Sequence, residues 1–134
     1  MASPNKTNLK IEIMNKNELR IGNFLMYDKK LIYISEITKA GIGMYDGYGL
    51  DKNSPIECLK PIKLTEKWLL DFGFKRQPWG LVKGGLLFQD KNLKCEELTI
   101  EIGNGFRTNL LYVHELQNLY FALTGNELKR VDGF

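Results

Sequence analysis

The sequence predicts an α+β fold, in which a bent antiparallel sheet packs against a C-terminal helix and a short middle helix. Short β-rich runs are separated by turn residues such as Gly84-Gly85 and Asn104-Gly105, a pattern typical of consecutive hairpins. Near the C-terminus the apolar residues recur at helical spacing, and Gly125 is expected to end that helix in a left-handed cap. The helical stripe consists of Tyr112, Leu116, Leu119, Tyr120 and Leu123.

The N-terminal segment differs from the rest of the chain. Leu9, Ile11 and Ile13 alternate with polar residues, but the segment is otherwise polar, so we expect residues 1–13 to be a flexible extension or a short strand. Residues 14–134 are expected to form a single compact domain. A chain of 134 residues buries roughly two-thirds of its unfolded surface, so it needs no disulfide or metal to fold.

A hairpin is predicted next. The β-rich runs Phe24–Tyr27 and Leu31–Ile37 are joined by a short polar turn, Asp28-Lys29-Lys30. They predict an SH3-like hairpin module in this part of the chain. The glycine-rich stretch Gly41–Gly49 that follows predicts a bulged strand or an exposed loop.

The middle of the chain alternates between extended and helical signals. Ile56–Lys63 predicts an extended segment at a sheet edge, because Pro61 cannot donate to a sheet ladder. Thr65 is a preferred N-cap residue, and the short helix that it begins is expected to end at Gly73. Four later runs predict a β-meander: Trp79–Lys83, Leu86–Gln89, Leu98–Ile102 and Phe106–Leu111.

The composition is that of an ordinary water-soluble protein, with 43% hydrophobic residues, 26% charged residues and a net charge of +3. Cys58 and Cys95 form no C-x-x-C pattern and there is one histidine, so we expect no metal site and no cofactor. No run approaches the roughly 20 apolar residues of a membrane span, and the N-terminus lacks the apolar region of a signal peptide. These features indicate a cytoplasmic protein.

His114 is the one candidate for acid–base catalysis. The neighbouring Glu115 would point about 100° away on a helix, and the amide of Asn118 is a structural partner rather than a catalytic one. We therefore interpret His114 as a structural residue, bonded locally or to solvent, and expect no catalytic residue and no enzyme. Gly41–Gly49 lacks both the following helix and the G-K-[ST] of a phosphate-binding loop.

The segment from residue 60 to residue 83 is the candidate partner-binding surface, because cations and aromatic residues interleave along it. Phosphate attraction and base stacking both need such side chains. The same composition also suits an amphipathic segment whose aromatic residues lie in the core, and both interpretations remain open. An exposed Trp79 beside Pro78 could instead anchor a protein interface. The candidate contacts are Lys60, Lys63, Lys67, Lys75, Arg76, Trp79 and Lys83, with Tyr45 and Tyr48 from the glycine-rich stretch.

Three segments together carry a resemblance to a known family: NELRIGNFLMYDKKLIYISEI, KPIKLTEKWLLDFGF and YVHELQNLYFALTGNEL. They resemble an uncharacterised family of small proteins from phages, prophages and mobile elements of Bacteroides-group bacteria. Its members share an E-L-R-I-G-N start, a P-I-x-L-T-E-x-x-L helix entry and a V-H-x-L-Q-N-L-Y-F-A-L-T-G-x-E-L ending. The match spans most of Asn17–Leu128, and no enzymatic motif is assigned to the family.

The resemblance implies a cytoplasmic protein that acts in an infected or lysogenised bacterium. The favoured hypothesis is a non-enzymatic inhibitor of a bacterial defence system, such as an anti-CRISPR protein that binds an RNA-guided nuclease effector or its guide RNA complex. The alternative is a nucleic-acid-binding accessory protein of a phage or mobile element. A small hydrolase centred on His114 is the third hypothesis. The expected partners are a bacterial defence complex and RNA, with no membrane.

Overall fold

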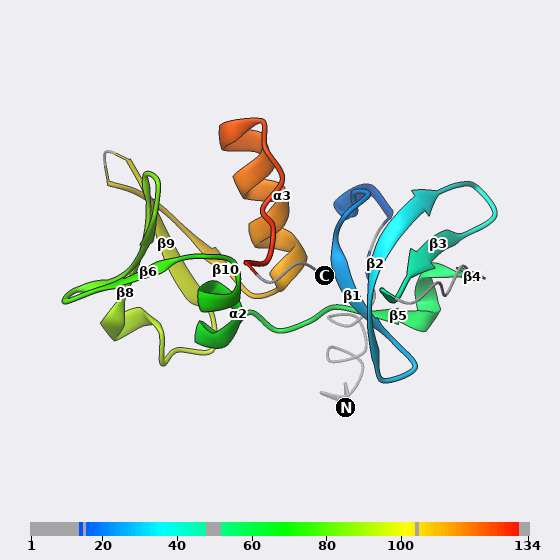
Figure 1. Cartoon of the computed structure of the whole chain (residues 1–134), viewed down its shortest axis with the longest axis horizontal. Coiled ribbons are helices and arrows are strands. Elements are labelled where there is room, and N and C mark those ends of the chain that lie inside the picture. The colour runs from blue at the N-terminus through cyan, green and yellow to red at the C-terminus, as the bar shows by residue number, and fades with distance from the viewer. Residues whose placement is uncertain (1–13, 15, 48–51, 104, 132–134) are drawn as a thin grey trace, which may run out of the picture. The chain divides into compact units, whose positions relative to one another are not determined.

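The computed structural model describes residues 14, 16–47, 52–103 and 105–131. The chain divides into two compact units, Met1–Ile62 and Lys63–Phe134 (Figure 1). The predicted extension over residues 1–13 lies outside the described residues. That residues 14–134 behave as one domain stays a prediction.

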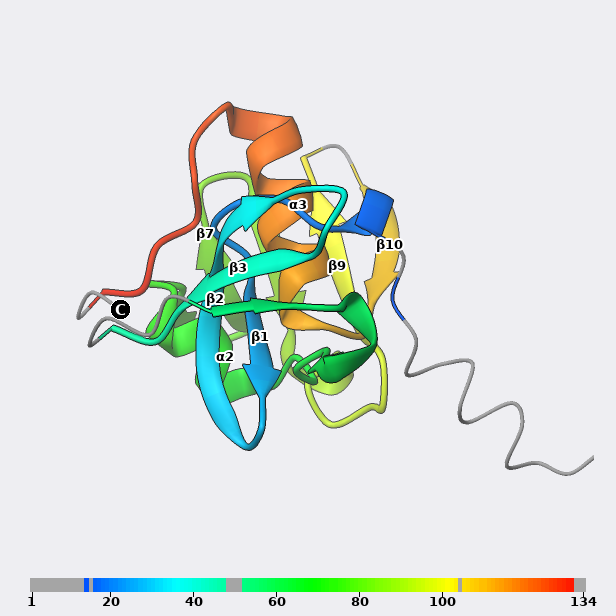
Figure 2. The same ribbon diagram turned by 90° about the vertical axis from the view of Figure 1, so that its right-hand side faces the viewer.

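The first unit is a five-stranded antiparallel sheet with strand order β4-β3-β2-β1-β5, and β1, β2 and β3 can be followed side by side in Figure 2. The fifth strand returns to pair with the first, so β1 lies between β2 and β5. The predicted hairpin is present as β1 and β2. The elements are η1 (Lys16–Glu18), β1 (Phe24–Tyr27), β2 (Lys30–Ile37), β3 (Ile42–Tyr45), β4 (Lys52–Ser54), η2 (Ile56–Cys58) and β5 (Leu59–Lys60).

The β1–β2 hairpin forms around a tighter turn than the sequence predicted. Tyr27 pairs with Lys30, so only Asp28 and Lys29 lie in the turn, with φ angles of 49° and 67°. Two residues of positive φ give the turn that matches the right-handed twist of the flanking strands. The strands enclose an apolar core made of Met14, Leu19, Leu25, Ile32, Ile34, Ile42, Met44 and Leu59.

Two other segments of this unit differ in detail from what the sequence predicts. The glycine-rich stretch contributes β3, but the bulge lies opposite it in β2, between Ile34 and Glu36. The stretch predicted as one extended segment, Ile56–Lys63, is a 3₁₀ turn followed by β5. β5 pairs with β1 alone and lies at the sheet edge, as Pro61 predicted.

The second unit combines two α-helices with a five-stranded meander, whose strand order is β10-β9-β8-β7-β6. The predicted meander is confirmed, but the sequence missed its first strand, and the strand predicted to begin at Trp79 begins at Gly80 because Pro78 and Trp79 form the turn. The elements are α2 (Glu66–Asp71), β6 (Lys75–Gln77), β7 (Gly80–Lys83), β8 (Leu86–Gln89), η3 (Asp90–Asn92), β9 (Leu98–Ile102), β10 (Phe106–Leu110) and α3 (Val113–Thr124).

Helix α2 begins and ends where the sequence predicted. The hydroxyl of Thr65 accepts a hydrogen bond from the backbone N–H of Trp68 at 3.5 Å, which satisfies one of the unpaired groups at the helix start. Leu69 and Phe72 are fully buried. Gly73 follows with a φ of 91°, a conformation that favours glycine and ends the helix.

Helix α3 has the predicted ends but a different buried face. Glu115 accepts hydrogen bonds from the N–H groups of Leu111 and Tyr112, at 2.8 and 3.0 Å, and Gly125 provides the left-handed cap. The predicted stripe is wrong at its C-terminal end, where Leu123 is 47% exposed, because the last turn of the helix lies beyond its packing partners. The buried residues of the helix are Val113, His114, Leu116 and Gln117.

The α+β class is therefore confirmed, with one difference in its layout. Within the described residues, the strands divide between two sheets rather than forming one bent sheet, and α2 and α3 belong to the second unit. The helices in the described ranges are too short and too polar to cross a bilayer.

Candidate interaction surface at the Trp79 turn

The β6–β7 hairpin presents an exposed tryptophan on a two-residue turn. Gln77 pairs with Gly80, so Pro78 and Trp79 form the turn, and Trp79 is 56% exposed. The ring of Pro78 fixes its φ near −65°, the value required at the first central position of a common β-turn. The indole is therefore carried on a stiff backbone. The interpretation that places the aromatic residues of this segment in the core is wrong for Trp79, and the alternative of an exposed Trp79 holds.

The backbone of this turn is packed closely against strand β8 and is hydrogen-bonded to Asp90. At Gly80 the chain passes so close to β8 that a Cβ would lie 2.1 Å from the carbonyl oxygen of Phe88. The carbonyl oxygen of Trp79 accepts a hydrogen bond from the N–H of Asp90 at 3.0 Å. The main chain is consequently fixed at Trp79 and at the residue that follows it.

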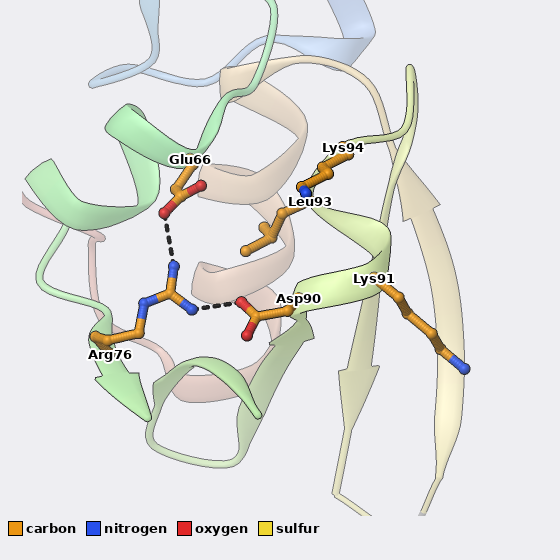
Figure 3. A pocket seen from close by; sticks show the side chains of 6 residues that line it. All are labelled: Glu66, Arg76, Asp90, Lys91, Leu93 and Lys94. Atoms are coloured by element: carbon orange, nitrogen blue, oxygen red, sulfur yellow. Dashed lines mark hydrogen bonds and ion pairs between the residues drawn. The ribbon is translucent and has the colours of Figure 1, made fainter. Parts of the chain in front are cut away.

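Arg76 connects the same hairpin to two other elements (Figure 3). Its guanidinium donates one hydrogen bond to the carboxylate of Asp90 in η3 and another, of 2.6 Å, to the carboxylate of Glu66 in α2. The hydrogen bond to Asp90 is the largest cause that raises the pKa of Arg76, and Glu66 adds to it. The charge of Arg76 is compensated locally by two carboxylates.

A shallow pocket of about 410 Å³ lies over this arginine. In Figure 3 the side chain of Leu93 points toward Arg76, whereas Lys91 points away from it. Ligand pockets of this size are usually lined by apolar and aromatic side chains. Five of the six residues that line this one are charged and none is aromatic, which suits a contact between protein surfaces better than a small-molecule site. The lining residues are Glu66, Arg76, Asp90, Lys91, Leu93 and Lys94.

The basic residues around Arg76 do not share one face. In the β6–β7 pairing Lys75 lies opposite Val82 and Arg76 lies opposite the fully buried Leu81. Successive residues of a strand point to opposite faces, so Lys75 and Arg76 project from opposite faces of the sheet. Lys83, at the far end of β7, is half-buried and lies beside Gly73.

Two further predicted contact residues are engaged in ion pairs. Lys63 binds Glu96 at 2.7 Å, and this hydrogen bond lowers the pKa of Glu96. Lys67 lies 3.4 Å from Asp71, one helical turn away. Together with Arg76, three of the six predicted cations therefore have carboxylate partners. Two of these carboxylates, Asp90 and Glu96, lie outside the segment from residue 60 to residue 83.

The remaining predicted contacts belong to the first unit. Lys60 is exposed on β5, and Tyr45 lies on β3 with its ring 5.3 Å from that of Tyr33. Strands β2 and β1 separate β3 from β5, so Tyr45 and Lys60 are not neighbours in the sheet. Tyr48 lies outside the described residues. Within the second unit, the structure thus links Arg76 to the Trp79 turn through Asp90. That the predicted residues form one contact surface stays a prediction.

His114 occupies a buried position rather than a reactive one. Its side chain is 1% exposed and its ring stacks on that of Tyr112, with the centroids 5.9 Å apart and an interplanar angle of 11°. The expectation that solvent could satisfy this histidine is wrong, because His114 lies on the buried face of α3 with Val113 and Gln117. No cluster of three or more potential metal-binding side chains occurs within the described ranges.

Glu66 and Asp90 are the residues of this surface that sequence reasoning missed. They are 10 and 14 residues from Arg76, and nothing in the local pattern links them to it.

Comparison of the chain with protein-family models, curated proteins and solved structures found no match.

Proposed function

We propose that this protein is a non-enzymatic inhibitor of a bacterial defence system, which binds an RNA-guided nuclease effector or its guide RNA complex through the Trp79 turn. The observation that carries the proposal is an indole 56% exposed on a turn whose backbone is fixed. Tryptophan is enriched among the residues that dominate binding energy, and a pre-ordered side chain loses little entropy on binding. The phage and defence context rests on the family resemblance of the three sequence segments.

The ion pairs favour a protein surface over bare nucleic acid as the partner. Phosphate contacts require cations that can exchange small counterions for phosphate. Lys63, Lys67 and Arg76 already have carboxylate partners, so phosphate would have to displace Glu96, Asp71 or the pair around Arg76. A guide RNA held within a protein complex remains compatible with a contact from Lys60, which is exposed on β5.

The test is co-purification with a tagged chain from a host that expresses an RNA-guided nuclease, combined with a plaque assay of immunity. The wild-type chain should retain the effector and restore phage growth. Trp79→Ala should weaken binding by about 30-fold or more, since interface hot spots contribute about 2 kcal/mol or more. Phe106→Ala is the matched control, because Phe106 is also an exposed aromatic residue of the second unit, at 66% exposure.

Two outcomes would overturn the proposal. A wild-type chain that neither retains a nuclease effector nor suppresses immunity would refute the function itself. Equal losses in Trp79→Ala and Phe106→Ala would refute the Trp79 turn as the interface.

The alternative, a nucleic-acid-binding accessory protein, makes a separate prediction about salt. If all six predicted cations contacted phosphates of single-stranded RNA, log K would fall with log salt concentration with a slope of about −4. The inhibitor proposal expects weak binding to free RNA at physiological salt. Tight binding of a plain RNA with the steep slope would favour the alternative.

A further inference from the structure

We propose that Arg76 is a positioning residue, which holds the Trp79 turn in the orientation that a partner protein binds. The inference rests on the proposed function, because it assigns a role within the same surface. The sequence grouped Arg76 with the residues that touch the partner. The structure instead places both ends of its guanidinium on carboxylates of this chain.

Asp90 makes the physical link between Arg76 and Trp79. Its carboxylate accepts from Arg76, and its backbone N–H donates to the carbonyl oxygen of Trp79 at 3.0 Å. One residue of η3 therefore holds the hairpin at two points, three residues apart along the chain. A shift of Asp90 moves the carbonyl of Trp79, and with it the peptide plane that carries the indole.

Glu66 anchors the other end of the same arginine. It is the first residue of α2, whose start is fixed by the cap from Thr65. Arg76 is bound by two carboxylates from two elements, so the entropy lost in ordering its long side chain is shared between two ion pairs. In an isolated surface pair the same entropy is lost for a single ion pair, which is one reason why such pairs contribute little to stability. The planar guanidinium suits this bridging role better than an ammonium group would.

Lys75 provides a matched control within the same strand. It is exposed, it projects from the opposite face of β6, and it makes no ion pair with the residues that the structure describes. Lys75→Gln and Arg76→Gln remove the same charge from neighbouring positions. A difference between them cannot come from net charge. A difference in the motion of Trp79 in the free protein therefore points to the links from Arg76 to Asp90 and Glu66.

The experiment measures the mobility of Trp79 directly. The chain has 2 tryptophans, so a Trp68→Phe background leaves Trp79 as the sole indole, and phenylalanine keeps an aromatic ring beside Phe72. Time-resolved fluorescence anisotropy then reports nanosecond motion of the turn. Arg76→Gln should increase the amplitude of the fast local decay, Lys75→Gln should leave it unchanged, and Arg76→Lys should give an intermediate value.

Binding to the co-purified effector gives the second measurement. Arg76→Gln should raise the dissociation constant by about two- to twelve-fold, the range expected from reordering one flexible side chain on binding. Lys75→Gln should leave the dissociation constant within about two-fold. Trp79→Ala should cost more than either substitution.

The outcomes separate this inference from the function on which it rests. If the wild-type chain has no effector partner, the proposed function fails, but the anisotropy comparison still decides whether Arg76 orders Trp79. Unchanged anisotropy in Arg76→Gln would overturn the inference. A large loss of binding with unchanged anisotropy would also overturn it, by showing that Arg76 touches the partner directly.

Discussion

Gly80→Ala tests the close approach of strands β7 and β8 beneath the Trp79 turn. A methyl group at residue 80 would lie 2.1 Å from the carbonyl oxygen of Phe88 and 2.9 Å from the Cα of Gln89. Both atoms belong to the backbone of β8, so neither can turn away as a side chain can. Relief requires the strands to separate where Gly80 pairs with Gln89.

The expected loss of stability follows from that geometry. Overpacking in a closely packed region costs about 1–3 kcal/mol. Separating the strands also weakens a ladder hydrogen bond, which contributes about 1 kcal/mol. We therefore expect Gly80→Ala to lower the free energy of unfolding by about 3 kcal/mol. The hydrogen bond from Asp90 to Trp79 should be disturbed as well, so partner binding should weaken in parallel.

Equilibrium unfolding in urea measures this loss, with Gly85→Ala as the control. A Cβ at Gly85 would meet no atom within 4 Å, so that variant should match the wild type or gain about 0.5 kcal/mol through the unfolded state. The fluorescence of Trp68 in α2 follows unfolding of the second unit. Equal midpoints for Gly80→Ala and Gly85→Ala would refute the close approach.

Three other substitutions test separate features of the structure. Lys29→Gly should stabilise the chain by about 0.5 kcal/mol in urea unfolding, because Lys29 has a φ of 67° that costs a side-chain-bearing residue about 1 kcal/mol; a loss would contradict the positive-φ turn. Thr65→Ala should cost about 1 kcal/mol in thermal unfolding by removing the N-cap of α2, and an unchanged melting temperature would show that the cap contributes nothing. Lys63→Gln should raise the pKa of Glu96 toward its ordinary value, measured by NMR titration of its carboxyl group. Because that pKa is lowered in the folded protein, the contribution of Glu96 to stability is present above its unfolded pKa and is lost as the pH falls through the folded value; the variant should lose this pH dependence.

The parts of the fold that the sequence predicted are those with local signals. Thr65 and Gly125 end their helices through contacts within one or two turns, so a short window contains the whole cause. Strand β6 was missed because Lys75, Arg76 and Gln77 are all polar and show no alternation. Edge strands tolerate such residues, since one side of the strand faces no neighbour.

The division of the strands into two sheets could not be predicted in the same way. Strand pairing depends on contacts between distant runs, and the runs that the sequence predicted as strands carry similar β-rich signals, which do not specify their partners. The exposure of Trp79 was suggested by its neighbour Pro78, which is a local cause. The links from Arg76 to Asp90 and Glu66 depend instead on how β6, η3 and α2 are arranged, which the sequence does not reveal.

The same distinction decides which property of the basic segment matters for function. Counted along the sequence, the segment is rich in cations and poor in carboxylates. In the folded protein Asp90 and Glu96, both from outside the segment, neutralise Arg76 and Lys63. Local pairing of this kind weakens the attraction for phosphate but leaves an exposed indole unaffected, because burial of apolar surface does not depend on free charge. Binding through the Trp79 turn should therefore depend only weakly on salt concentration, whereas binding of RNA to the same segment should fall steeply as salt rises.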